Sequence, residues 1–347
     1  MTTLRVALLS TVFCSFGFQA LQAQTVIQGA GATFPYPLYS KWISEYKKIN
    51  PSVNINYQSI GSGGGIKQIT ERTVDFGATD APMSGSELAK VKSPIYHIPM
   101  TLGAVVVAYN VPGVGPGLKL TPEVLSGVFM GSITTWNDPR VAGLNPGVKL
   151  PNTPITVAYR TDGSGTTAVF TEYLAKVSVD WKSKVGAGKS VKFPAGLGAK
   201  GNEGVTGLVK SSPGAIGYLE LAYAKQNNMA VAAIRNKVGK FVVPSPEGVT
   251  SAASGNVVPT DLCLSITDGP GAKDYPISSF SYILVYQDQQ DGTKGKVLAD
   301  FLWWATHEGQ KFAAALDYAP LPAKDVLPKI EAKLRTLKAA GQQLIKK

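Results

Sequence analysis

The segment YRTDGSGTT, residues 159–167, has the residue types of an anion-binding site. Arg160 supplies a fixed positive charge, and the hydroxyl side chains and the backbone N–H groups near the glycines supply hydrogen-bond donors. A carboxylate in the same segment, Asp162, would repel an anion held there. The expected ligand is therefore an anion for which donors, one cation and a nearby acid are all favourable.

Two other glycine-rich joints have a similar composition, GAGATFPYP at residues 29–37 and IGSGGGIKQ at residues 60–68. Each leads into an expected helix, as Ser164, Gly165 and Thr166 do in the first segment. The unpaired N–H groups and the positive end of the helix dipole make a helix N-terminus receptive to anions. Ordinary helix capping explains each joint singly, so the three would form one site only if the fold brought them to one cleft.

A second acid of interest is Asp80 in VDFGATDAPMS, residues 74–84. The pattern predicts a short strand that ends in a turn, and the Ala81-Pro82 pair that follows favours extended backbone. From these residues alone, a turn-forming aspartate that bonds its own backbone is the more frequent explanation.

Two nucleotide-binding patterns are present but lack the expected context. VGAGKS at residues 185–190 ends like a P-loop, but Ser183 stands where the motif needs glycine, and the preceding VDWKSK is no buried strand. GLGAKG at residues 196–201 matches G-x-G-x-x-G, with Glu220 near the distance of a ribose-binding acid. Pro194 argues against a central strand before it, so a plain loop is expected there.

Catalytic and metal chemistry have little support in the sequence. The two histidines, His97 and His307, show no paired spacing of the kind that holds zinc, and we predict no metal and no cofactor. Cys263 has no histidine near it in sequence and is expected to be a buried apolar cysteine. We therefore expect no enzyme; the alternative, an exported hydrolase of phosphate esters, would need a metal cluster or an activated nucleophile.

The composition and the N-terminus indicate an exported globular protein. The chain has 347 residues, 44% of them hydrophobic and 16% charged, which is enough for one large or two medium domains. Residues 1–23 combine a positive charge at Arg5, an apolar run and small residues up to Ala23, which predicts a cleavable signal peptide. Cys14 lies in that run, so the mature chain would keep one cysteine and no internal disulfide.

Positive charge exceeds negative charge along the chain, with a formal net charge of +11. The basic residues are dispersed and are densest in the last segment, residues 333–347, which is expected to be a solvated amphipathic helix. An excess of positive charge is typical of proteins that bind nucleic acid, a membrane surface or an anionic small molecule. The predicted export of this protein argues against nucleic acid as the partner.

The elements that must position these residues alternate between strands and helices, which predicts an α/β protein. Strands are expected at residues 53–60, 103–110, 154–160 and 281–286. Helices are expected at residues 36–49, 65–73, 166–177 and 295–316. The loops at residues 111–117 and 267–276 are candidate places for the chain to pass between two lobes.

Several segments together resemble the periplasmic phosphate-binding proteins of high-affinity phosphate ABC transporters. They are GAGATFPYPLYSKW, IGSGGG, VDFGATDAP, DGSGTT, GLGAKGNEGV and PGAIGYLELAYAKQNN. The resemblance covers nearly the whole mature chain and implies a type II periplasmic-binding-protein fold, with a ligand cleft between two lobes and two crossover hinge segments. The implied lobes are residues 24–103 with 283–347, and residues 104–282.

The resemblance also implies a set of phosphate contacts. In this chain they fall on Thr33, Phe34 (through its backbone amide), Ser62, Asp80, Arg160, Ser164, Gly165 and Thr166. Asp162 would pair with Arg160 behind the ligand. The family often carries a second serine in the IGSGGG joint, where this chain has Gly63.

Phosphate as the ligand would explain the acid. Near neutral pH phosphate carries one or two protons and sulfate carries none, so the Asp80 carboxylate could accept a hydrogen bond from phosphate only. Against sulfate, the buried mismatch would cost on the order of several kcal/mol. Arsenate is protonated as phosphate is, so Asp80 would not exclude it.

The implied function is that of a periplasmic receptor. It would bind inorganic phosphate between its lobes and deliver it to the permease and ATPase subunits of a phosphate ABC transporter. A monomer that binds no nucleic acid is expected.

Overall fold

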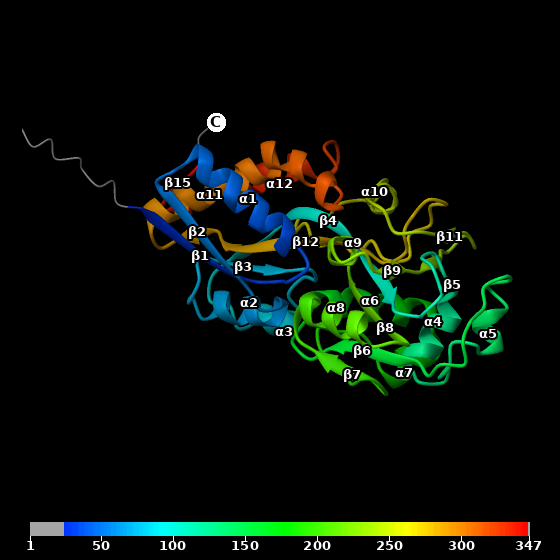
Figure 1. Ribbon diagram of the computed structural model, residues 1–347. Coiled ribbons are helices and arrows are strands. Elements are labelled where there is room, and N and C mark those ends of the chain that lie inside the picture. The colour runs from blue at the N-terminus through cyan, green and yellow to red at the C-terminus, as the bar shows by residue number, and fades with distance from the viewer. Residues whose placement is uncertain (1–23, 346–347) are drawn as a thin grey trace, which may run out of the picture.

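The computed structural model describes residues 24–345. The predicted signal peptide at residues 1–23 lies outside the described residues. The remaining chain is a mixed α/β structure organised around one long, curled sheet, whose strand order is β2-β1-β3-β12-β4-β8-β6-β7 with β9 paired to β4 (Figure 1). These strands are β1 Thr25–Gly31, β2 Val53–Ser59, β3 Phe76–Thr79, β4 Ile95–Tyr109, β6 Thr156–Arg160, β7 Leu197–Ala199, β8 Ala215–Glu220, β9 Ala230–Val231 and β12 Ser278–Tyr286.

Two parallel sets of strands lie at the two ends of this sheet and define two lobes. In lobe I, β1 pairs in parallel with β2 and β3. In lobe II, β6 pairs in parallel with β7 and β8. The antiparallel strands β4 and β12 lie between the two sets and join them (Figure 1).

The chain passes between the lobes inside β4. Residues 95–104 of this strand pair with β12, and residues 105–109 pair with β8. Every residue of β4 from His97 onward is buried, as is typical of a central strand that is covered on both faces. The return crossing lies just before β12, where the Val105 N–H donates to the Ile277 carbonyl. The passage therefore occurs before the loop at residues 111–117, in a strand that both lobes share.

Helices cover both faces of the lobe I strands. Helices α1, α11 and α12 lie on one side of this part of the sheet and α2 and α3 on the other (Figure 1). The lobe I helices are α1 Tyr36–Ile49, α2 Ser62–Thr70, α3 Gly85–Leu88, α11 Gly292–Thr306 and α12 Leu327–Leu334, with the 3-10 turns Glu308–Phe312 and Ala314–Leu316 after α11.

Lobe II carries the remaining helices and a small sheet. Its helices are α4 Pro122–Phe129, α5 Pro139–Ala142, α6 Gly165–Val177, α7 Val179–Lys184, α8 Gly201–Ser211, α9 Leu221–Gln226 and α10 Pro246–Ala253. The small sheet joins β5 Lys119–Leu120, β10 Ala233–Arg235 and β11 Phe241–Val242, and another, in lobe I, joins β13 Asp288–Gln289, β14 Lys338–Ala339 and β15 Gln342–Gln343.

Most predicted elements occur, and three differ in extent or type. The strand expected at residues 103–110 begins earlier, because β4 runs from Ile95 to Tyr109. Helices at residues 36–49 and 166–177 occur as expected. The helix expected at residues 295–316 ends at Thr306, where the chain tightens into 3-10 turns. The helix expected at residues 333–347 is absent from the described part, because α12 ends at Leu334 and the segment turns back as β14 and β15, which pair with β13.

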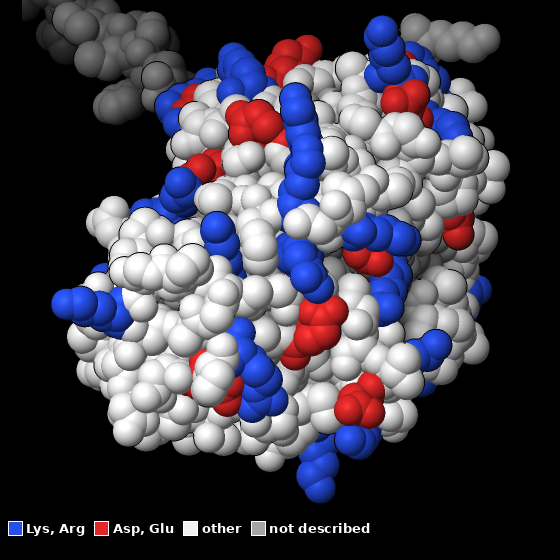
Figure 2. Space-filling model, turned by 90° about the vertical axis from the view of Figure 1, so that its right-hand side faces the viewer, with Lys and Arg blue, Asp and Glu red and all other residues white. Residues whose placement is uncertain are grey.

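Figure 2 shows basic and acidic side chains spread over the face in view, with several basic groups next to one another near its middle. Within residues 24–345 no helix combines the length and apolar character needed to cross a bilayer.

Candidate functional site

The three glycine-rich joints meet at one place between the lobes. Each follows the carboxyl end of a parallel strand, the edge at which open α/β sheets place their ligands. Thr33 follows β1, Ser62 follows β2, and Ser164 follows β6. Ser62 is the first residue of α2, and Ser164 caps α6 by accepting a 3.0 Å hydrogen bond from the Thr167 N–H. Of the three joints, Ser164 alone makes the expected side-chain cap, because α1 and α2 begin without a side-chain cap hydrogen bond. The structure nevertheless brings all three joints together.

Asp80 enters the same site from the end of β3 and is 1% exposed. The Ser281 hydroxyl donates to its Oδ1 at 2.8 Å, and the Ser62 hydroxyl lies 3.5 Å from its Oδ2. Burial raises the pKa of Asp80 to about 7, although the Ser281 hydroxyl and the charge of Arg160 both lower it. Asp80 is therefore a buried carboxyl group that can change its protonation state near neutral pH.

Arg160 and Asp162 form a buried ion pair in lobe II. The Arg160 side chain donates from Nε to Asp162 Oδ1 at 2.8 Å and from its Nη2 to Asp162 Oδ2 at 2.5 Å. The Gly201 N–H also donates to Asp162 Oδ1, at 3.0 Å. Burial by itself would raise the pKa of Asp162, but the hydrogen bonds and charge of Arg160 hold it below its usual value. Asp162 therefore stays ionised and fixes the guanidinium plane.

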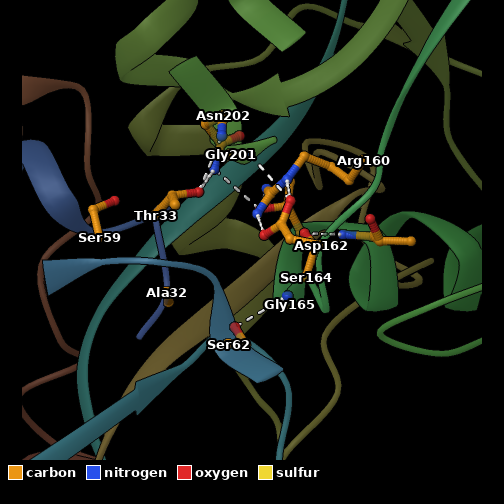
Figure 3. Close-up of polar contacts among 12 residues, drawn as sticks. Ala32, Thr33, Ser59, Ser62, Arg160, Asp162, Ser164, Gly165, Gly201 and Asn202 are labelled. Atoms are coloured by element: carbon orange, nitrogen blue, oxygen red, sulfur yellow. Dashed lines mark hydrogen bonds and ion pairs between the residues drawn. The ribbon is translucent and has the colours of Figure 1, made fainter. Parts of the chain in front are cut away.

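The lobes meet directly across the site. The Gly165 N–H, in lobe II, donates to the Ser62 hydroxyl of lobe I at 3.0 Å (Figure 3). Nearby, the Gly63 N–H donates to the Gly163 carbonyl at 2.8 Å. A Cβ atom on Gly165 would lie 2.5 Å from the Ser62 hydroxyl and 2.6 Å from Asp80 Oδ2, so only glycine allows this approach.

All predicted contact residues lie in this region and are buried. Thr33, Phe34, Ser62, Asp80, Arg160, Ser164 and Thr166 are each at most 5% exposed, and Gly165 is buried as well. Phe34 packs its ring near Tyr318, whose hydroxyl donates to the Phe34 carbonyl at 2.6 Å. The role of the eight predicted residues as phosphate contacts remains a prediction.

Two residues of the site were missed by sequence reasoning, Asn202 and Ser281. The Asn202 side-chain amide donates to the Thr33 hydroxyl at 2.7 Å and to the Thr166 hydroxyl at 3.2 Å, so it links the two lobes (Figure 3). Asn202 follows Gly201, which has φ of +73°, at the start of α8. Gly201 and Asn202 are the first two residues of α8, and the sequence analysis predicted no helix there.

The loop interpretation of GLGAKG, residues 196–201, is accordingly wrong. The segment forms the edge strand β7 and leads into α8, whose N-terminus faces the site. Dinucleotide binding gains no support from this, because the acid expected on the ribose, Glu220, is fully buried and caps α9 by accepting from the Ala222 N–H at 2.7 Å. VDWKSK, before VGAGKS, is the helix α7 and not a P-loop strand.

The other reactive residues lie apart from the site. His97 accepts a hydrogen bond from the Met83 N–H at 2.9 Å, and burial lowers its pKa to about 4, so it is a neutral structural histidine. Cys263 is half-buried and not fully buried as expected, and burial raises the pKa of its thiol to about 12. Among residues 24–345, no group of three or more His, Cys, Asp or Glu side chains could hold a metal ion.

The site can therefore hold a small, hydrogen-bonding anion. It lies at the N-terminal ends of α1, α2, α6 and α8 and contains one fixed cation and several hydroxyls, together with one carboxyl group that can accept a hydrogen bond from the ligand.

Comparison with known proteins agrees with this description. Residues 19–308 match the model of the PBP superfamily domain. The chain is 45% identical over 337 residues to the phosphate-binding protein PstS of Pasteurella multocida, covering 96% of each chain. It is 47% identical to the PstS of Haemophilus influenzae, covering 89% of this chain and 92% of that one.

Solved structures share the fold at lower identity. A phosphate-binding protein from Stenotrophomonas maltophilia superposes with a TM-score of 0.72 at 20% identity, covering 89% of this chain and 94% of that one. A putative phosphate ABC transporter substrate-binding protein from Clostridium perfringens, with bound phosphate, gives 0.64 at 18% identity, covering 86% and 100%. The matching family model and the two PstS relatives show that this chain belongs to the PBP superfamily, in the family of the phosphate-binding proteins PstS. It has the two-lobed type II fold of that family.

Proposed function

We propose that this protein is a periplasmic receptor that binds inorganic phosphate between its lobes and delivers it to the membrane permease and ATPase subunits of a phosphate ABC transporter. The observation that carries the proposal is the buried Asp80 carboxyl group placed among N–H and hydroxyl donors and one arginine. We further propose that it acts as a monomer, carries out no catalysis, and is exported through a cleavable signal peptide.

The chemistry of the site favours a protonated oxyanion. Arg160 and the helix N-termini satisfy ligand oxygens that carry lone pairs. Asp80 needs a donor, and a protonated phosphate oxygen supplies one, whereas every sulfate oxygen would face Asp80 with lone pairs. Selectivity then comes from a repulsive group that only the wrong anion meets.

Isothermal titration of the mature protein with phosphate, sulfate and arsenate tests the proposal. We expect tight one-to-one binding of phosphate, no detectable binding of sulfate, and some binding of arsenate because it shares phosphate's protonation. Sulfate binding as tight as that of phosphate would contradict the proposal. Turnover of a chromogenic phosphate ester that is lost in Ser164→Ala would instead support the hydrolase.

The predicted lobes, residues 24–103 with 283–347 and residues 104–282, would close over phosphate by bending near residues 103–115 and 267–283. One contact that would hold them closed is the Lys189 ammonium of lobe II, which donates to the Pro82 carbonyl and to Glu87 Oε2, each at 2.9 Å.

We expect Lys189→Met to release phosphate about three- to tenfold faster, because this partly buried ion pair is worth roughly 1 kcal/mol and exists only between closed lobes. Stopped-flow measurement of the release rate tests this. Lys184→Met is the matched control, since Lys184 is exposed and pairs only with Asp180 on its own helix, 3.8 Å away. An unchanged release rate in Lys189→Met would show that the contact is no latch.

A further inference from the structure

The proposed function does not explain the groups that surround Asp80 on the side away from the cleft. Strand β12 runs antiparallel to β3, the strand that ends at Thr79. Two serines on β12, two residues apart and therefore on the same face of the strand, both reach Asp80. The Ser279 hydroxyl donates to the Asp80 backbone carbonyl at 3.0 Å, and the Ser281 hydroxyl donates to Asp80 Oδ1 at 2.8 Å.

These contacts make the two carboxylate oxygens of Asp80 unequal. Oδ1 is occupied by the Ser281 hydroxyl, and Ser281 is fully buried. Oδ2 faces the opposite lobe, because a Cβ atom on Gly165 would lie 2.6 Å from it. Its contact to the Ser62 hydroxyl is long, at 3.5 Å, so Oδ2 keeps acceptor capacity on the side of the cleft.

We propose that Ser281 is a positioning residue for anion selectivity: its hydroxyl holds Asp80 Oδ1 and thereby keeps Asp80 an ionised acceptor whose Oδ2 is aimed at the ligand. The inference rests on the proposed function, since it concerns how the site distinguishes a protonated from an unprotonated oxyanion. Ser281 lies 201 positions from Asp80 in the sequence, outside the three glycine-rich joints.

The hydrogen bond has a defined direction. A carboxylate only accepts, so Ser281 must donate its proton to Asp80, and this donation stabilises the ionised form. A protonated Asp80 would itself become a donor and could satisfy a sulfate oxygen. Loss of the Ser281 donor therefore favours the form of Asp80 that cannot reject sulfate.

The charged and titratable groups that face Asp80 come from each element packed around it. They are Arg160 of β6, Tyr39 of α1, Tyr57 of β2 and Tyr318 near the C-terminal end. Burial, above all, raises the pKa of each of these three tyrosines well above its usual value, so they stay neutral. Asp80 is the group among them whose protonation changes near neutral pH.

Tyr39 lies behind Ser281 and supports this arrangement. Its hydroxyl is buried and has no hydrogen-bond partner among the described residues. The pKa of Tyr39 is raised by burial and by the charge of Asp80 and lowered by the Ser281 hydroxyl, so the three side chains interact. Tyr39, Ser281 and Asp80 therefore form one group of buried polar side chains.

The test compares phosphate and sulfate affinity between pH 5 and 9 for the wild type, Ser281→Ala, Ser281→Thr and Ser278→Ala. In Ser281→Ala we expect the phosphate-to-sulfate affinity ratio at pH 7 to fall about tenfold or more, since a hydrogen bond to a charged group is lost. Without the Ser281 donor, Asp80 should become protonated at a higher pH. We therefore expect the pH below which the preference for phosphate over sulfate is lost to rise by about one unit. Ser281→Thr keeps the hydroxyl and should restore both.

Ser278→Ala is the matched control. Ser278 is a fully buried serine of the same strand, and its hydroxyl donates to the Tyr275 carbonyl at 2.7 Å and not to Asp80. It should leave the ratio and its pH profile unchanged even if it lowers stability. If Ser281→Ala fails to fold, Ser281→Cys keeps the volume and replaces the strong donor by a weak one.

The outcomes separate the two proposals. A wild type that binds phosphate selectively, together with a Ser281→Ala profile that matches it, overturns the role of Ser281 and leaves the proposed function standing. A wild type that does not prefer phosphate overturns both. An equal loss in Ser278→Ala and Ser281→Ala overturns the inference as well, because it shows a general effect of strand stability.

Discussion

Replacement of Asp80 by asparagine should abolish the discrimination between phosphate and sulfate. An asparagine amide has both a carbonyl acceptor and an N–H donor, so it can satisfy a protonated phosphate oxygen or a sulfate oxygen equally. The wild-type carboxyl group, buried and 1% exposed, can only accept while it is ionised, that is, above its pKa of about 7. At pH 9, about two units above that pKa, protonating Asp80 to suit sulfate would cost roughly 2.7 kcal/mol, so the affinity ratio should fall by about a hundredfold.

Asp80→Ala should give a different result. It removes the acceptor without adding a donor, so phosphate affinity should fall by about ten- to a hundredfold, the usual worth of a charge-assisted hydrogen bond. Titration of both anions into both variants measures the two effects separately. An Asp80→Asn protein that still rejects sulfate would show that another group reads the proton of the ligand.

Asp75→Asn is the control for both Asp80 variants. Asp75 is also an aspartate of lobe I; it accepts from the Gln28 N–H at 2.7 Å and pairs with Lys294 at 3.2 Å. Its loss should change stability modestly and leave anion selectivity as it is.

Arg160→Met should cost phosphate affinity and stability together. The Arg160 side chain is 1% exposed, and we propose that it is the cation that contacts the ligand. Without it, the ligand loses its charged partner, and Asp162 keeps only the Gly201 N–H at 3.0 Å as a fixed donor. Removing one partner of a buried ion pair costs about 3–5 kcal/mol, so we expect affinity to fall by at least about a hundredfold and the unfolding midpoint to drop.

Two further variants separate charge from geometry. Arg160→Lys keeps the charge but loses the two-pronged contact to Asp162, so it should recover only part of the affinity. Asp162→Asn should weaken binding less than Arg160→Met, because we expect Asp162 to orient the guanidinium and not to contact the ligand. Equal losses in Asp162→Asn and Arg160→Met would place Asp162 in the ligand's own contact set.

Arg235→Met is the control, since Arg235 pairs with Glu123 at 3.0 Å on the surface of lobe II. Exposed pairs of this kind contribute roughly 0–1 kcal/mol, so the variant should bind phosphate as the wild type does. Denaturant unfolding of each ligand-free variant distinguishes loss of the site from loss of the fold.

The sequence by itself determined the local parts of this protein. Three features depend on neighbours in the chain: the periodicity of α1 and α6, the capping hydroxyl of Ser164, and the Arg160–Asp162 pair two residues apart. Such features follow from nearby residues, because helix capping and short-range ion pairs need no distant partner. The C-terminal segment was mispredicted because its pairing partner, β13, lies about fifty residues away, and strand pairing depends on that distant contact.

Only the tertiary structure decided which of these parts form a site. Ser62 meets Gly165 across 103 positions, Asn202 meets Thr33 across 169, and Ser281 meets Asp80 across 201. These contacts exist because parallel strands from two lobes end at a shared edge, while β4 and β12 hold the lobes together. The unequal carboxylate oxygens of Asp80, and its pKa of about 7, come from burial among residues that no local pattern links to it.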